Sequence, residues 1–154
     1  TSPDISGLIG QYAHGNEPSH HIAHLYNYVG QPWRTQEIVD EVLHTLYFNN
    51  PDGLSGNEDC GQMSAWYILN AMGFYQVCPG KSVYSIGRPL FNEATVHLKD
   101  GKSFKVIAHN NSRDNKYVRS IVLNGNKLET PFFTHQDIVD GGTLELTMGS
   151  EPLK

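Results

Sequence analysis

The amino-acid sequence predicts an α+β protein in which helices come first and strands follow. Before about residue 80, apolar residues recur at the spacing of one helix face. After that point, short runs rich in β-branched residues alternate with turns that contain Gly, Asn and Asp. We therefore expect a helical part over residues 1–80 and a β-rich part over residues 81–154.

Three helices are expected in the first part, over residues 18–29, 35–47 and 61–72. The first would bury an apolar face made of Ile22, Leu25, Tyr26 and Val29. Thr35 is the expected N-cap of the second helix, and Gly73 follows the last turn of the third. Three helices leave apolar surface uncovered, so we expect them to pack against an upstream part of a larger protein or to self-associate.

Five strands are expected in the second part, separated by turn-forming residues. They cover residues 81–87, 93–98, 103–109, 116–123 and 142–148. The dipeptide Asn124-Gly125 is typical of the two-residue turn of a tight hairpin. We expect these strands to form an antiparallel, sandwich-like sheet.

Composition limits the possible functions. The chain has 154 residues, a net charge of −5 and 11 Lys and Arg without a basic run, which argues against nucleic-acid binding. No apolar run approaches the roughly 20 residues of a membrane span, and the first residues lack the basic head and apolar centre of a signal peptide. Cys60 and Cys78 are too few for a disulfide framework, so we expect two small buried thiols, with a bridge between them as the alternative.

Four histidines cluster around the start of the first expected helix: His14, His20, His21 and His24. His20 and His24 are four residues apart and share a helix face, a spacing that zinc pairs use. However, the Glu of an HExxH motif is missing, and no downstream Cys/His pair completes a tetrahedral site. We therefore favour hydrogen-bonding or sugar-binding histidines in a polar cleft over structural zinc, with histidines that have no binding role as the alternative.

The stretch GNEP places Asn16 and Glu17 directly before the first expected helix. One interpretation is a capping turn, in which these side chains accept hydrogen bonds from free N–H groups. The other is a site for a hard cation, because calcium prefers carboxylate, amide and carbonyl oxygens from loops. The residue types alone do not separate the two.

The stretch GNEDCGQ places Glu58 and Asp59 before the third expected helix. A capping turn again explains both acids, but a carboxylate at a helix N-terminus also suits a general base, because the helix dipole favours its charged form. Gln62 and Trp33 add an amide and a flat aromatic surface, which are common in carbohydrate sites. Two acid-bearing turns, each opening a helix, together favour a sugar-processing cleft.

Two longer stretches resemble a known family. The sequences HGNEPSHHIAHLYNYVGQPWRTQ and GNEDCGQMSAWYILNAMGFYQVCPG are similar, in the same order, to the C-terminal part of glycoside hydrolase family 92. The resemblance is dense from Gln11 to about Leu90 and looser beyond. Members are calcium-dependent exo-acting α-mannosidases that hydrolyse terminal α-mannose with inversion, and they are mostly bacterial and exported.

The resemblance implies the last helices of an (α/α)6 barrel, followed by C-terminal β structure. It places Asn16 and Glu17 at the calcium site, and it makes Asp59 and Glu58 the catalytic acids of the turn that holds the general base, chiefly Asp59. We expect His20, His21, Trp33 and Gln62 to bind the mannose-containing glycan.

The family's general acid lies upstream of GNEP, in a part of the enzyme that this chain does not contain. Glu58 and Asp59 are adjacent, so they cannot flank one glycosidic bond at the roughly 6.5–9.5 Å that inversion needs. We therefore expect the chain to need the upstream part of the same enzyme, to be inactive alone, and to come from an extracytoplasmic bacterial enzyme.

Two functions of other classes remain as alternatives. A non-catalytic carbohydrate-binding module would use exposed aromatic side chains of the β part, such as Phe132 and Phe133. An interaction domain would use the two turns only as helix caps.

Overall fold

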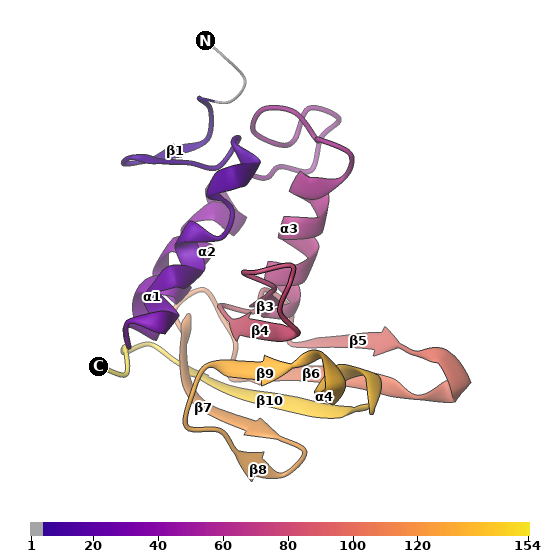
Figure 1. The fold of residues 1–154 in the computed structure, drawn as a ribbon. Coiled ribbons are helices and arrows are strands. Elements are labelled where there is room, and N and C mark those ends of the chain that lie inside the picture. The colour runs from indigo at the N-terminus through magenta and orange to yellow at the C-terminus, as the bar shows by residue number, and fades with distance from the viewer. Residues whose placement is uncertain (1–4) are drawn as a thin grey trace.

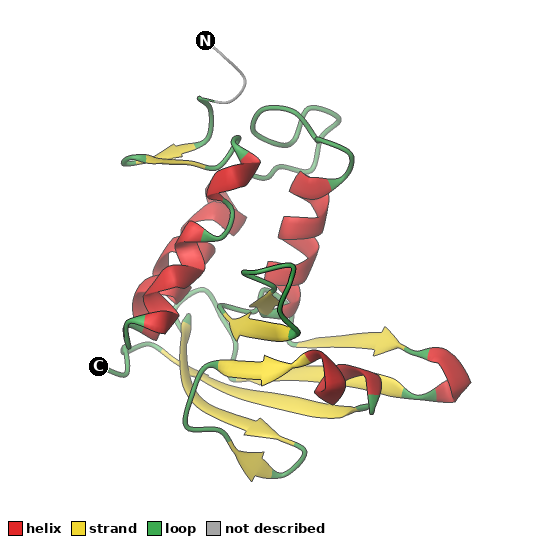
Figure 2. Ribbon diagram, in the orientation of Figure 1, coloured by secondary structure: helices red, strands yellow, loops and turns green. Residues whose placement is uncertain are grey.

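The computed structural model describes residues 5–154 and confirms the α+β class, with helices first and two β-sheets after them (Figure 1). The helices rise from one side of the sheets, and strands dominate the second half of the chain (Figure 2). Within the described residues, no helix is both long and apolar enough to cross a bilayer.

The helical part begins with a two-stranded hairpin and continues through two 3₁₀ turns into three α-helices. These elements are β1 (Leu8–Ile9), β2 (Tyr12–Ala13), η1 (Glu17–Ser19), η2 (Ile22–His24), α1 (Leu25–Tyr28), α2 (Pro32–Thr45) and α3 (Gln62–Met72). The third helix agrees with its prediction, and Gly73 ends it in a left-handed conformation with φ of 106°. The second begins three residues before the expected N-cap, with Pro32 in its first turn, and Thr35 lies buried inside it.

The first predicted helix is wrong in both form and orientation. Two 3₁₀ turns and a single α-turn replace it. The expected apolar face is largely exposed, with Leu25 at 42% and Val29 at 68%. The buried face is instead the one that carries His20, Ala23, His24 and Asn27. These polar side chains can be buried because each has hydrogen-bond partners, which the apolar pattern does not reveal.

The β part forms two sheets. In the three-stranded sheet the order is β3 (Phe74–Tyr75), β4 (Val83–Ile86) and β9 (Phe132–Thr134). In the five-stranded sheet the order is β5 (Glu93–His97), β6 (Ser103–His109), β10 (Gly142–Gly149), β7 (Tyr117–Leu123) and β8 (Asn126–Lys127). The short elements η3 (Lys99–Gly101) and α4 (His135–Val139) lie between strands.

Within residues 5–154, strand pairing is antiparallel except at one place. The central strand β10 pairs antiparallel with β7 but parallel with β6, with Leu144 opposite Val106. The expectation of a purely antiparallel sheet is therefore corrected at this pair. A long connection through β7, β8, β9 and α4 separates β6 from β10, so β10 can enter the sheet in the same direction as β6. The predicted hairpin is confirmed, because Asn124 and Gly125 both have positive φ, 50° and 80°, between β7 and β8.

Two hydrophobic clusters hold the fold. The larger belongs to the sheets and includes Phe74, Phe104, Phe133, Leu144 and Leu146. The smaller belongs to the helices and contains Ala23, Val39, Val42, Leu43 and Trp66.

Two sequence predictions fail on burial. Phe133 is only 3% exposed and packs against Tyr84 and Phe104, so the exposed aromatic face of a β-side sugar-binding module is missing there. Phe132 is partly buried against Tyr28, with ring centroids 4.8 Å apart. Cys60 and Cys78 are free and exposed rather than buried, because both lie in turns outside the two clusters.

A buried ion pair joins α2 to the loops of the β part. Arg88 is 2% exposed, and its Nε lies 2.8 Å from Asp40 Oδ1 on α2. The same guanidinium donates to the backbone carbonyls of Pro89 and, at 2.9 Å, Ser112. The Val118 N–H also donates to Gln36 Oε1 of α2. These polar contacts tie α2 to the β part.

We predict that Arg88→Met lowers the free energy of unfolding by about 3–5 kcal/mol, because it leaves the nearly buried Asp40 without its main partner. The matched control is Arg34→Met on α2, the helix that carries Asp40, where the arginine of the Arg34–Glu37 pair is 58% exposed. That control should cost less than about 1 kcal/mol. Urea denaturation of both variants measures the difference, and equal losses would contradict the assignment.

Candidate active site

Five of the predicted site residues line one cleft of about 520 Å³ in the helical part: Glu17, His20, His21, Asp59 and Gln62. Tyr75, Gln76, Val77 and Pro79 complete its walls from β3 and the turn after it. Glu17 and Asp59, more than forty residues apart in sequence, therefore line the same cleft.

The turn before α3 contains two acids, Glu58 and Asp59, whose carboxylates have different surroundings. Backbone carbonyls of Asp59 and Glu58 accept from the N–H groups of Gln62 and Met63. The Glu58 carboxylate accepts from the Ser64 N–H and from the Ser64 hydroxyl, both at 2.8 Å. Glu58 thus acts as the cap of α3 and is not among the residues that line the cleft, so the geometry supports the capping interpretation for this acid.

Asp59 is the acid of this turn that lines the cleft. Within residues 5–154, its exposed carboxylate has no hydrogen-bond or ion-pair partner. Its backbone is left-handed, with φ of 48°, and so are the next two residues, Cys60 at 57° and Gly61 at 92°. Left-handed conformations are unfavourable for residues other than Gly, and such strain concentrates at functional sites. The strained backbone thus lies at the acid whose carboxylate takes no part in capping α3.

Glu17 brings a second carboxylate to the cleft. Its Oε1 is buried and has no hydrogen-bond partner among the described residues, an unfavourable state for a polar atom. A hard cation would satisfy such an oxygen. Asn16 does not line the cleft. Its backbone carbonyl accepts from the Ser19 N–H at 2.8 Å. In the described part of the chain, no group of three or more His, Cys, Asp and Glu residues could hold a metal, so Glu17 would supply only part of a cation site.

His20 connects the cleft to the interior. Its Nε2 lies 2.9 Å from the His14 backbone carbonyl, and its Nδ1 lies 3.1 Å from Gln62 Nε2. The same Gln62 nitrogen donates to the Tyr75 hydroxyl at 3.2 Å. Burial lowers the pKa of His20, although the His14 carbonyl and the nearby Glu17 oppose this effect. The ring is therefore held neutral as a structural hydrogen-bonding group.

His14 lies beneath His20 and is completely buried. Its Nδ1 is 2.8 Å from the Tyr12 hydroxyl, and its Nε2 is 2.6 Å from the Tyr47 hydroxyl, which itself donates to the Met63 carbonyl. Because Tyr47 has only one proton, it must accept from His14 Nε2–H, and Tyr12 then donates to Nδ1. Burial lowers the His14 pKa to about 3, with a smaller contribution from His20.

His24 closes a second buried chain of hydrogen bonds. Its Nε2 donates to Asn70 Oδ1 at 2.8 Å, and its Nδ1 lies 3.0 Å from Ser85 Oγ. The amide of Asn27 donates to the same hydroxyl, and the amide of Asn70 donates to the Trp66 carbonyl. Ser85 belongs to β4, so this chain links the segment behind the cleft to the sheet. No nitrogen of His24 is left to bind zinc.

The sequence missed the roles of His14, Tyr47 and Tyr75. Tyr47 is separated from His14 by more than thirty residues, and Tyr75 reaches Gln62 from the strand after α3. No local pattern signals such distant pairs. The only available sign was the excess of polar residues on the first predicted helix.

Trp33 lies apart from the other predicted sugar-binding residues. It sits in the first turn of α2 and lines a separate cavity of about 150 Å³ with Gln36, Val118 and Leu128. The structure therefore does not bring Trp33 into the cleft.

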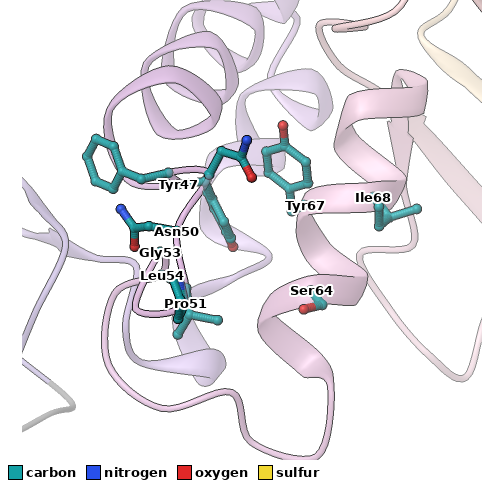
Figure 3. Close-up of a pocket in the computed structure, with 10 residues that line it drawn as sticks. Tyr47, Asn50, Pro51, Gly53, Leu54, Ser64, Tyr67 and Ile68 are labelled. Carbon is teal, nitrogen blue, oxygen red and sulfur yellow. The ribbon is translucent and has the colours of Figure 1, made fainter.

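A further cavity of about 470 Å³ lies on another side of α3. Figure 3 shows that its walls come from α3, with Ser64 and Tyr67, and from the segment after α2, with Tyr47, Asn50, Pro51 and Leu54. It contains none of the predicted site residues. The candidate site is therefore the cleft that holds both Glu17 and Asp59.

Known proteins of one family resemble this chain. Residues 1–150 match the sequence profile of the glycosyl hydrolase family 92 catalytic domain. The chain belongs to this family. This family 92 chain is 46% identical to an α-mannosidase of the same family from Bacteroides thetaiotaomicron, with a TM-score of 0.90 over 95% of this chain and 20% of that one. A structure of that enzyme in complex with mannoimidazole gives a TM-score of 0.93 over 97% of this chain and 20% of that one.

Two further relatives extend the comparison. An inverting family 92 mannosidase from Bacteroides thetaiotaomicron is 49% identical, with a TM-score of 0.86 over 93% of this chain and 19% of that one. A protein of Arthroderma benhamiae described as an uncharacterized secreted glycosidase is 31% identical over 140 residues, 89% of this chain and 18% of its own length. This family 92 chain thus spans about a fifth of the length of these relatives.

We predict that the His24 network makes the protein less stable in acid. Burial lowers the His24 pKa to about 4, against 6.5 ordinarily, while its bond to Asn70 opposes the shift. Unfolding therefore takes up a proton between these values, and the free energy of unfolding falls as the pH drops from about 6.5 towards 4. Above pH 6.5 the His24 ring is neutral in both the folded and the unfolded protein, so it does not contribute to the pH dependence of the free energy of unfolding.

The test compares slopes of unfolding free energy against pH, from urea denaturation at pH 7, 6 and 5. His24→Gln should reduce the slope below pH 6.5 by up to about 1.4 kcal/mol per pH unit, the value for one proton. His97→Gln, at an exposed position of β5, is the matched control and should keep the slope of the unsubstituted protein. A slope unchanged by His24→Gln would contradict the prediction.

Proposed function

We propose that this chain forms one wall of the active site of an inverting α-mannosidase that removes terminal α-linked mannose from glycans. The observation that carries the proposal is the shared cleft, in which the unpaired Asp59 faces the same space as Glu17, His20, His21 and Gln62. The similarity to two family 92 mannosidases, one described as inverting, supports the substrate and the stereochemistry.

In this proposal Asp59 is the general base. Its carboxylate accepts a proton from the water that attacks the anomeric carbon, while a general acid protonates the leaving oxygen on the other side of the bond. Asp59 suits the role because neither an ion pair nor a cap uses its oxygens within residues 5–154. Glu58 does not take part, because both of its carboxylate oxygens are occupied by Ser64.

Calcium is the proposed cofactor, with Glu17 Oε1 as its carboxylate ligand and Asn16 contributing from the same turn. The buried, unpartnered oxygen of Glu17 supports this assignment. A calcium ion bound there would supply contacts to sugar hydroxyls and help to distort the ring. The described residues include no complete set of His, Cys, Asp and Glu, so the remaining ligands would be amide or carbonyl oxygens, waters or groups from other parts of the same enzyme.

We further propose that the general acid and the rest of the sugar pocket come from other parts of the same enzyme. The length of the relatives supports this, since the chain spans about a fifth of them. In that arrangement Leu25 and Val29, exposed at 42% and 68%, would pack against neighbouring helices of the catalytic domain. Self-association through the same residues is the alternative for the isolated chain.

Function outside the cytoplasm is also proposed, because the relative from Arthroderma benhamiae is described as secreted. A bacterial source is consistent with the two similar mannosidases from Bacteroides thetaiotaomicron. A purely carbohydrate-binding role of the β part has less support, since Phe133 is buried.

The decisive variant is Asp59→Asn in the full-length enzyme. Loss of the general base should lower kcat on an α-mannose disaccharide by about 10²–10⁴-fold with little change in folding. Glu58→Gln keeps an acceptor oxygen for Ser64 and should change kcat less than tenfold. The 154-residue chain alone should be inactive on the disaccharide. Calcium-dependent turnover by the isolated chain, or equal loss in both variants, would contradict the proposal.

A further inference from the structure

Within the described residues, the side-chain amide of Gln62 donates hydrogen bonds but accepts none. An amide has two N–H donors on one side and a carbonyl acceptor on the other. Gln62 Nε2 lies within hydrogen-bond distance of two groups, His20 Nδ1 at 3.1 Å and the Tyr75 hydroxyl at 3.2 Å. The two donors are therefore both engaged inside the protein.

His20 sets this orientation. Its Nε2 faces the His14 backbone carbonyl, which can only accept, so the proton of the neutral ring resides on Nε2. Nδ1 then carries a lone pair and must accept. If Gln62 were turned round, its carbonyl oxygen would face this lone pair, and an acceptor would meet an acceptor.

The carbonyl oxygen of Gln62 consequently points elsewhere. It has no partner among the described residues, and it is not among the fully buried unpartnered atoms. Because Gln62 lines the cleft next to Asp59, this oxygen is an acceptor open to a ligand.

Tyr75 is left with the complementary role. Its oxygen accepts from Gln62, and no acceptor within residues 5–154 takes its proton. Burial raises the Tyr75 pKa, although the hydrogen bond from Gln62 opposes this, so the hydroxyl keeps its proton at neutral pH. Its ring packs near those of His24 and Trp66, with centroids 5.5 and 6.3 Å away. Tyr75 therefore offers a fixed donor to the cleft it lines.

We propose that Gln62 and Tyr75 form an acceptor–donor pair that binds two hydroxyl groups of the terminal sugar beside Asp59. The Gln62 carbonyl accepts from one hydroxyl and the Tyr75 hydroxyl donates to another. The pair rests on the proposed function, because it takes the terminal mannose as the ligand. His20 is a positioning residue for the pair, since it directs the Gln62 amide without contacting the sugar.

The test uses the full-length enzyme, an aryl α-mannoside, and its 2-, 3-, 4- and 6-deoxy analogues. Tyr75→Phe removes one hydroxyl and should lower kcat/KM on the parent mannoside about tenfold, the effect of one lost hydrogen bond. On one deoxy analogue, which lacks the hydroxyl that Tyr75 contacts, variant and unsubstituted enzyme should have the same kcat/KM. Gln62→Met should show the same pattern with a different analogue.

The matched control is Tyr84→Phe. The Tyr84 hydroxyl forms a hydrogen bond with His135 away from the cleft, so its removal should leave kcat/KM unchanged. Equal losses on the parent and all four analogues would mean a merely structural role and would overturn the pair, as would no loss at all. If Tyr75→Phe does not fold, Gln62→Met with the same analogues decides the question. Failure of the unsubstituted enzyme to hydrolyse any α-mannoside would instead overturn the proposed function, and the pair with it.

Discussion

Buried histidine rings are the constraint on which the helical part depends. His14, His20 and His24 are each at most 1% exposed, and a buried ring nitrogen without a partner costs roughly 1–3 kcal/mol. Six nitrogens therefore need six partners, which come from the hairpin and the turn after it, the segment after α2, α3 and β4. Because these partners come from distant parts of the sequence, satisfying the rings also fixes how the elements meet.

The same constraint shapes the cleft. The hydrogen bonds to His20 and Tyr75 use both donors of Gln62, and its carbonyl oxygen has no partner among the described residues. The Glu58 carboxylate accepts from the N–H and the hydroxyl of Ser64. Within the described residues, the oxygens without a partner at the cleft are those of the Asp59 carboxylate, the buried Oε1 of Glu17 and the amide oxygen of Gln62. An oxygen-rich cleft of this kind suits sugar hydroxyls, an attacking water and a hard cation. The left-handed backbone at Asp59 and Cys60 is the local cost of the arrangement.

Sequence reasoning succeeded where structure follows from neighbouring residues. The helix α3, the strands β6 and β7 and the Asn124-Gly125 turn have local periodicity or turn chemistry, and the two acid-bearing turns could be recognised by composition. It failed at the first helix, because apolar spacing identifies a buried face only when the buried side chains are apolar. It could not find Tyr75 or separate Glu58 from Asp59, since both depend on which distant group each side chain meets.

The hydrogen bonds of the three buried rings require each ring to be neutral, with its proton on Nε2. Long-range ¹H–¹⁵N correlation spectra of the 154-residue chain, labelled at histidine and recorded at pH 7, test it directly. We expect a protonated Nε2 and an unprotonated Nδ1 for His14, His20 and His24. A proton on Nδ1 of His20 would contradict it, because the Gln62 amide would then have to turn its carbonyl inward and its donors towards the cleft.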